Sequence, residues 1–163
     1  VIDDLLAPFD DRVLLRQHDP LMSPLAWDLA HVANYEDLWL LRALGASATV
    51  DGLDDLYDAF KQPRRIRESL PMLRPDAALR YGEEVRARVI DHLVQLDLRA
   101  DGPDPLLRDG AVHQMVVQHE HQHAETLLAS IQLLPSDEGY VRLAGPVPAG
   151  RPLATAEVQI KTM

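Results

Sequence analysis

The sequence predicts an all-α protein: an up-and-down four-helix bundle with a long connection between the second and third helices. Two observations lead to this fold class. Four long stretches repeat apolar residues at helical spacing, and almost no segment alternates in the manner of a strand. The chain has 163 residues, of which 47% are hydrophobic and 26% charged, so one domain with a substantial core is expected.

The first two helices are expected in the first 45 residues. The first spans about residues 2–18 and has one apolar side, formed by Leu5, Leu6, Phe9, Val13 and Leu14. The second lies in "SPLAWDLAHVANYEDLWLLRALG", residues 23–45. Here Ser23 is a natural N-cap, Pro24 suits the first helical position, and Gly45 suits the C-cap.

The second half of the bundle follows a long connection at residues 46–73, in which one short helix is expected at about 53–60. The third helix is predicted at about 76–98 and the fourth at about 110–134. The connection is interpreted as a crossover or an active-site lid. After Pro135 the sequence is rich in Gly and Pro, with a weak strand-like ending. We therefore expect a bundle domain at 1–138 and a linker or tail at 139–163.

Composition excludes several classes of function. The formal net charge of −10 argues against nucleic-acid binding, because phosphate contacts require the opposite sign. The chain contains no cysteine, which rules out disulfides, thiolate ligands and a cysteine nucleophile. No apolar run approaches the roughly 20 residues that span a bilayer, and the acidic start is unlike a signal peptide. We expect a cytoplasmic protein with no membrane partner.

The stretch "QHEHQHAETLL", residues 118–128, contains the strongest chemical signal. Residues four apart on a helix share one face, so His119 and His123 project together while His121 points about 200° away from His119. The pair replaces core residues within an apolar stripe, which comprises Val112, Val116, Leu127, Ile131 and Leu134. Two buried imidazoles need partners for their nitrogens, and a shared Zn, Fe, Ni or Cu ion provides one.

A third ligand is expected from another helix, and His31 is the best candidate because it shares an apolar face with Trp27 and Tyr35. His18, His92 and His113 are interpreted as ordinary histidines. Three imidazoles from two helices, with coordination positions left open, are typical of a catalytic metal site. The same stretch also satisfies the zinc-protease pattern H-E-x-x-H, with Glu120 as the base. That alternative is disfavoured because no strand supplies a substrate-binding edge.

The segment "KQPRRIR", residues 61–67, is a basic exception in an acidic chain. One interpretation is a solvated turn that balances the acidic residues just before it. The other is a docking point for a small anionic substrate, because the arginine guanidinium matches a carboxylate in shape. In either case we expect exposed arginines that contribute little to folding.

Three segments together closely resemble the sulfoxide synthases of ergothioneine biosynthesis, also called hercynine oxygenases. These are the "SP-x-x-W-x-L-A-H" helix, the "YDAFKQPR" connection and the "H-E-x-Q-H-x-E-T" helix, which occur in the family's order. The resemblance covers about residues 1–145. It implies a DinB-like four-helix bundle whose three histidines bind non-haem iron(II), carried over here to His31, His119 and His123, with Zn or Ni as other ions that the site could load.

The resemblance also implies substrates and their contacts. The family joins a thiol sulfur to the imidazole of hercynine with dioxygen, and γ-glutamylcysteine is the expected thiol. Gln122 matches a glutamine that places the hercynine imidazole. Arg67, or failing that Arg64, matches an arginine that holds the γ-glutamylcysteine carboxylate. Family members continue into a domain that resembles formylglycine-generating enzymes, and nothing after Gly139 resembles it. The alternative is a stand-alone DinB-like thiol transferase or metal-binding module.

Overall fold

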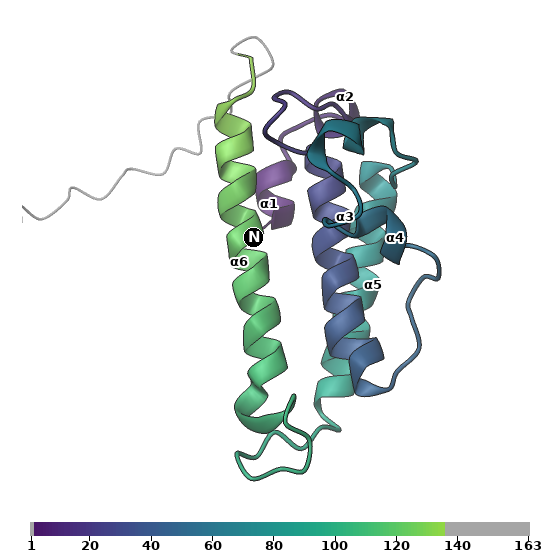
Figure 1. Ribbon diagram of the computed structural model, residues 1–163, viewed down its shortest axis with the longest axis vertical. Helices are drawn as coiled ribbons and strands as arrows, with labels where there is room; N and C mark the ends of the chain where they lie inside the picture. Colours follow the sequence, from purple (N-terminus) through teal and green to yellow (C-terminus); the bar gives the residue numbers. More distant parts are fainter. Residues whose placement is uncertain (1, 136–163) are drawn as a thin grey trace, which may run out of the picture.

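The computed structural model describes residues 2–135, and within this range every regular element is helical. Three long helices run side by side, with the short helix α1 alongside α6 and the short helix α2 near one end (Figure 1). The α-helices are α1 (Ile2–Leu6), α2 (Asp11–Leu15), α3 (Leu25–Glu36), α4 (Asp54–Tyr57), α5 (Pro75–Leu93) and α6 (Ala111–Gln132). The predicted all-α bundle is confirmed. The expected linker at 139–163 lies outside the described residues.

The expectation of one helix over residues 2–18 is wrong, because α1 and α2 are separate. Pro8 lies two residues after Leu6, where α1 ends; a proline has no backbone N–H to donate and its ring clashes with the carbonyl four residues earlier. The chain restarts at Asp10, whose Oδ1 accepts a hydrogen bond of 3.0 Å from the backbone N of Val13. The two short helices together take the place of the first helix of the bundle.

The second predicted helix is confirmed in position but differs at its start and along its length. It begins at Leu25 with Pro24 in the N-cap position, so the expected capping role of Ser23 is wrong. After Glu36 the helix widens into a π-helical turn, η1 (Asp37–Leu41), and then tightens into the 3₁₀ turn η2 (Arg42–Leu44). It ends at Gly45, whose φ of 90° is the left-handed conformation expected of a glycine C-cap.

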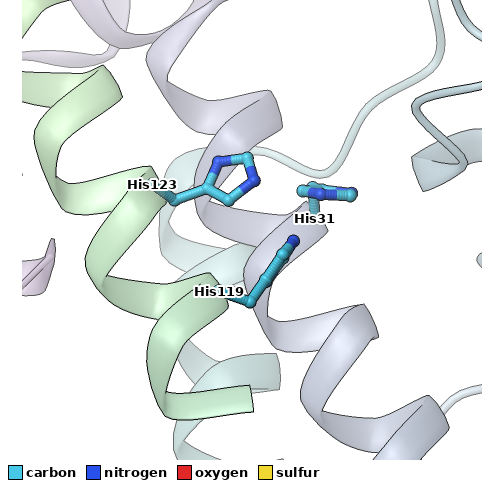
Figure 2. Close-up of side chains that lie close together, drawn as sticks. All are labelled: His31, His119 and His123. Carbon is cyan, nitrogen blue, oxygen red and sulfur yellow. The ribbon is translucent and has the colours of Figure 1, made fainter. Parts of the chain in front are cut away.

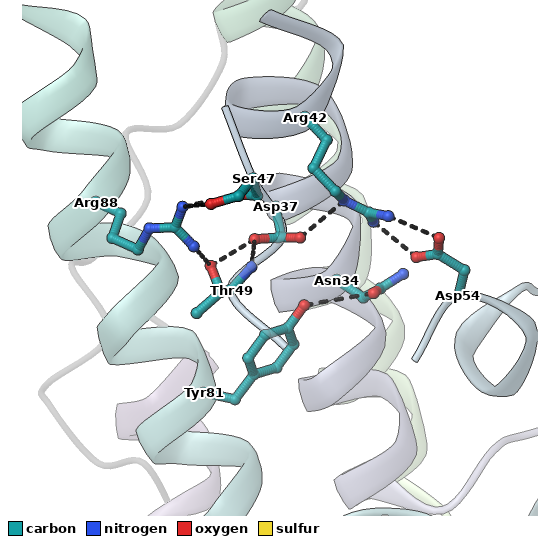
Figure 3. Close-up of polar contacts among 8 residues, drawn as sticks. All are labelled: Asn34, Asp37, Arg42, Ser47, Thr49, Asp54, Tyr81 and Arg88. Carbon is teal, nitrogen blue, oxygen red and sulfur yellow. Dashed lines mark hydrogen bonds and ion pairs between the residues drawn. The ribbon is translucent and has the colours of Figure 1, made fainter. Parts of the chain in front are cut away.

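Polar contacts hold the connection between η2 and α5 against the end of this helix (Figure 3). Asp37 is fully buried, and its Oδ1 accepts hydrogen bonds from the backbone N and the hydroxyl of Thr49 at 3.0 and 2.5 Å. Its other oxygen forms a 2.9 Å ion pair with Arg42, which also donates two hydrogen bonds to Asp54. Arg88 of α5 donates to the Thr49 hydroxyl. These contacts fix the point where α4 begins.

The core lies between α3, α5 and α6. α5 ends at Leu93, five residues before the predicted end, whereas α6 matches its predicted span to within two residues at each end. The apolar stripe of α6 is buried as expected, with Leu127 fully enclosed. Between residues 2 and 135, none of the helices combines the length and apolar character needed to cross a bilayer.

Candidate metal centre

His31 is buried on α3 and its ring is held from two sides. Its Nδ1 lies 2.7 Å from the backbone oxygen of Tyr57 at the end of α4. A carbonyl only accepts hydrogen bonds, so Nδ1 carries the proton and Nε2 keeps a free lone pair. The indole of Trp27 stacks on the imidazole at 4.9 Å between ring centroids, with the planes 11° apart. The neutral ring therefore presents a metal-ligating nitrogen in a fixed orientation.

His119 and His123 project from successive turns of α6 toward His31 (Figure 2). The centroid of the His31 ring lies 5.2 Å from that of His119 and 4.7 Å from that of His123. One ligating atom from each of the three residues lies within 4.8 Å of the others. Metal–nitrogen bonds measure about 2.0–2.1 Å, so a small inward movement of the rings lets one ion reach all three.

Burial keeps these imidazoles neutral, which is the form that binds a metal. It lowers the pKa of His119 to about 4 and that of His123 to about 3, with the neighbouring His31 as the next cause in both. Burial likewise lowers the pKa of His31. The Nδ1 atoms of His119 and His123 are buried without a hydrogen-bond partner. Three neutral nitrogen ligands with unsatisfied polar atoms fit a divalent transition metal.

The three histidines open into a cavity of about 690 Å³ between α3, α6 and the connection that contains α4. Its wall is rich in aromatic side chains: Trp27, Tyr35, Trp39, Tyr57 and Phe60. The ring of Tyr35 stacks on His119 at 3.8 Å between centroids, with the planes 16° apart. The volume is in the range of small-molecule pockets, and the predicted substrate residues Gln122, Arg64 and Arg67 all line it.

Arg67 does not match the expectation of an exposed arginine, because its side chain is buried. Its Nη1 donates to the hydroxyl of Ser23 at 2.6 Å, and its Nε donates to the backbone oxygen of Gln62 at 2.8 Å. Its guanidinium carbon also lies 3.6 Å from the centroid of the Trp27 ring. Arg64 is exposed at the same cavity. The two arginines of the basic segment therefore differ in role: Arg67 is tied into the fold, and Arg64 is free to meet a ligand.

The remaining candidates lie away from the cluster. His121 is exposed and lies outside the three-histidine cluster; it borders a surface depression that Tyr35, His119 and Gln122 also line. His92 has its Nδ1 at 3.3 Å from the backbone oxygen of Leu40, and His18 has its Nε2 at 2.9 Å from that of Val13. Neither belongs to a cluster of possible metal ligands within residues 2–135.

Sequence reasoning missed three groups that lie against the site. The only sequence signal for the stacking of Tyr35 on His119 is that both residues lie on apolar helix faces. The carbonyl of Tyr57 left no signal at all, because any residue at that position has a carbonyl. Asp28 sits one turn before His31 and is buried beside His123, and its place within an otherwise apolar helix face is the signal that could have found it.

Comparison with known sequences decides the family. A sequence model of the DinB superfamily matches residues 1–127 of the chain. The chain belongs to the DinB superfamily.

This DinB-superfamily chain is also similar to proteins named hercynine oxygenase. It is 45% identical over 152 residues to the one from Mycolicibacterium thermoresistibile, covering 90% of this chain and 32% of that protein. It is 42% identical over 154 residues to the one from Mycolicibacterium smegmatis, covering 90% and 33%. The figures for the one from Mycobacterium tuberculosis are 44% over 133 residues, 78% and 29%. The DinB-superfamily chain thus spans about a third of the length of these relatives.

The zinc-protease alternative finds no support in the geometry of this DinB-superfamily domain. Its H-E-x-x-H pattern requires Glu120 to face the metal together with the histidines. Instead, Glu120 accepts a hydrogen bond of 3.3 Å from Arg86 of α5 and is absent from the wall of the three-histidine cavity. The third histidine comes from α3, upstream of the motif, rather than from a downstream segment.

Proposed function

We propose that this chain is the iron-binding domain of a non-haem iron(II), oxygen-dependent sulfoxide synthase that joins γ-glutamylcysteine to hercynine in ergothioneine biosynthesis. One observation carries the proposal: three neutral histidines converge at the wall of a small-molecule cavity. Supporting it, relatives at 42–45% identity over most of this chain are named hercynine oxygenase. A cytoplasmic location is part of the proposal and accords with the absence of cysteine.

The metal ligands in this proposal are His31, His119 and His123. Iron(II) is favoured over Zn or Ni by the name oxygenase, since iron supplies the redox chemistry that activates dioxygen. The protein keeps all three imidazoles neutral by burial and fixes the His31 ring through its hydrogen bond to the chain. The aromatic wall restricts water around the site, which strengthens polar interactions inside it.

The cavity offers matching contacts for both proposed substrates. Hercynine is a trimethylated histidine, and its quaternary ammonium suits an aromatic wall through cation–π attraction. Gln122 lies one residue before His123 on α6, where its amide can meet the imidazole of hercynine. The exposed guanidinium of Arg64 is the better placed partner for a γ-glutamylcysteine carboxylate. Arg67 adds positive charge to the same wall while holding it in place.

The alternative function is a stand-alone DinB-like thiol transferase or metal-binding module. It shares the three-histidine site and differs in having no oxygenase partner domain. The identity of 42–45% to proteins named hercynine oxygenase, over most of this chain, favours the synthase. We therefore keep the transferase as the second candidate.

Metal stoichiometry tests the site directly. We expect the chain to bind one Fe(II) or Co(II), and His123→Ala to abolish this binding because it removes one of three ligands. His121→Ala is the matched control, two residues away on the outer side of α6, and should bind as the unchanged chain does. Equal loss in both variants would refute the assignment.

Substrate binding separates the synthase from the transferase. In the proposed synthase, a longer protein that would contain this chain, Arg64→Ala should raise the KM for γ-glutamylcysteine at least tenfold, because a charged hydrogen bond contributes about 1.5–3 kcal/mol. Arg65→Ala, exposed and absent from the cavity wall, is the control. Sulfoxide formation from hercynine, γ-glutamylcysteine and dioxygen is the readout, and its absence in the longer protein would favour the transferase.

A further inference from the structure

Asp28 is a buried carboxylate to which the proposed metal site assigns no role. It lies on α3 one turn before His31, and only 2% of its surface is exposed. Its Oδ2 has no hydrogen-bond partner, although it lines the cavity. Burying a carboxylate oxygen without a hydrogen-bond partner is unfavourable. The chain therefore keeps at this position a buried oxygen that no group in the described part of the fold satisfies.

The atom that faces Asp28 is also without a partner. Oδ1 of Asp28 lies 3.6 Å from Nδ1 of His123, and this nitrogen is buried with no hydrogen bond. The distance is a few tenths of an ångström longer than a hydrogen bond. The two groups are complementary, since an imidazole N–H donates and a carboxylate only accepts. A small rotation of the ring satisfies both.

The geometry points to Asp28 as the positioning residue of His123. Its carboxylate accepts a hydrogen bond from Nδ1–H, so the proton stays on Nδ1 and the lone pair is on Nε2, the ring nitrogen that Figure 2 shows directed toward His31. This inference rests on the proposed metal site. Carboxylate partners of this kind fix the tautomer of a metal-bound histidine and raise its basicity. The Tyr57 carbonyl already does the same for His31.

Two observations separate positioning from direct ligation. Within the described residues, the atoms close enough to share one ion belong to the three histidines alone, and Asp28 is not among them. The carboxylate is also held from behind, because a hydrogen bond with the Ser23 hydroxyl and the charges of Arg67 and Arg64 act on it. Ser23 in turn accepts from Arg67. A polar chain therefore runs from the basic segment through Asp28 to His123.

The tautomers of the metal-free chain test this inference without any turnover. Long-range ¹H–¹⁵N spectra at pH 7.5 should show both His31 and His123 protonated at Nδ1. In Asp28→Ala, His123 should shift toward the Nε2-protonated form, while His31, held by a backbone carbonyl, stays unchanged. An unchanged His123 in this variant, or an Nε2-protonated His123 in the unchanged chain, would overturn the inference.

Metal affinity gives a second, independent readout. Titration with Co(II) should show affinity about 10–100-fold weaker in Asp28→Ala, the range typical of lost orienting partners. Asp28→Asn should lose less, because the amide oxygen still accepts. Asp37→Asn is the control: it alters an equally buried aspartate of the same helix that lies outside the cavity, so it should lower stability and leave affinity unchanged.

The outcomes of this titration are separable. If Asp28→Ala and Asp28→Asn bound Co(II) with the same affinity as each other, the inference would be overturned. A loss in Asp28→Ala as complete as that in His123→Ala would also overturn it, since Asp28 would then be a ligand. If Asp28→Ala does not fold, as judged by circular dichroism, Asp28→Asn provides both readouts. If the unchanged chain binds no Co(II), the metal site itself fails, and the tautomer spectra still decide the pairing.

Discussion

Arg67→Ala should destabilise the fold by about 1.5–3 kcal/mol, although the residue lies in a basic segment that the sequence marks as surface. Two short charge-assisted hydrogen bonds, to Ser23 and to the backbone of Gln62, contribute about 1.5 kcal/mol each. The stacking on Trp27 adds about 0.5–1 kcal/mol. Alanine does not carry the entropy cost of immobilising a long side chain, and this offsets about 1–2 kcal/mol of the loss.

For a chain of 163 residues, this loss corresponds to a melting temperature about 5–10 °C lower. Urea denaturation of the metal-free chain, followed by circular dichroism, measures it. Arg65→Ala should stay within about 0.5 kcal/mol of the unchanged chain, because this neighbour is exposed. Arg67→Lys should fall between the two, since it keeps the charge without the planar fork. Arg67→Ala and Arg65→Ala with equal midpoints would refute the reasoning.

The metal-free chain should lose stability as the pH falls from about 6.5 to 4, because the buried His119 and His123, with pKa values of about 4 and 3, take up protons mainly after unfolding. Burial raises the pKa of Asp28 to about 6, which acts in the opposite direction, but this single carboxyl is outnumbered by the three histidines whose pKa values burial lowers. The urea midpoint should therefore be lower at pH 5 than at pH 7.5. If the double variant His119→Phe/His123→Leu showed the same pH dependence, these two histidines would not be its cause. Leu127→Ala should destabilise by about 3 kcal/mol, because this side chain is fully buried, whereas its half-exposed neighbour Leu128 should lose less than 1 kcal/mol on the same change. Chemical denaturation of the two variants compares them, and similar losses would contradict the assigned facing of α6.

The sequence was sufficient for the features that depend on spacing along one helix. The facing of His119 and His123 follows from a four-residue step within an apolar stripe, and His31 follows from its own stripe on α3. Features that depend on contacts between distant segments were not accessible. Arg67 is buried because Ser23, 44 residues earlier, accepts from it, and no local pattern encodes that pairing.

Local rules also failed where two of them compete. Pro8 interrupts an otherwise periodic stretch, and the proline rather than the periodicity determines where the helix ends. The π-helical turn at Asp37–Leu41 fits the same apolar spacing as a regular helix, so its widening depends on tertiary contacts. Among these contacts are those of the buried Asp37 with Thr49 and Arg42.

The hydrogen bond from His31 to the main-chain oxygen of Tyr57 has a consequence for how this protein can vary over time. Every amino acid carries that oxygen, so no point mutation at position 57 can delete the acceptor itself; only a change in the path of the chain can do so. His123 differs, since its facing group is the side chain of Asp28, which a single nucleotide change can replace. Among natural variants, position 57 is therefore free to drift as far as its packing allows, while any drift at position 28 acts on a histidine of the cluster.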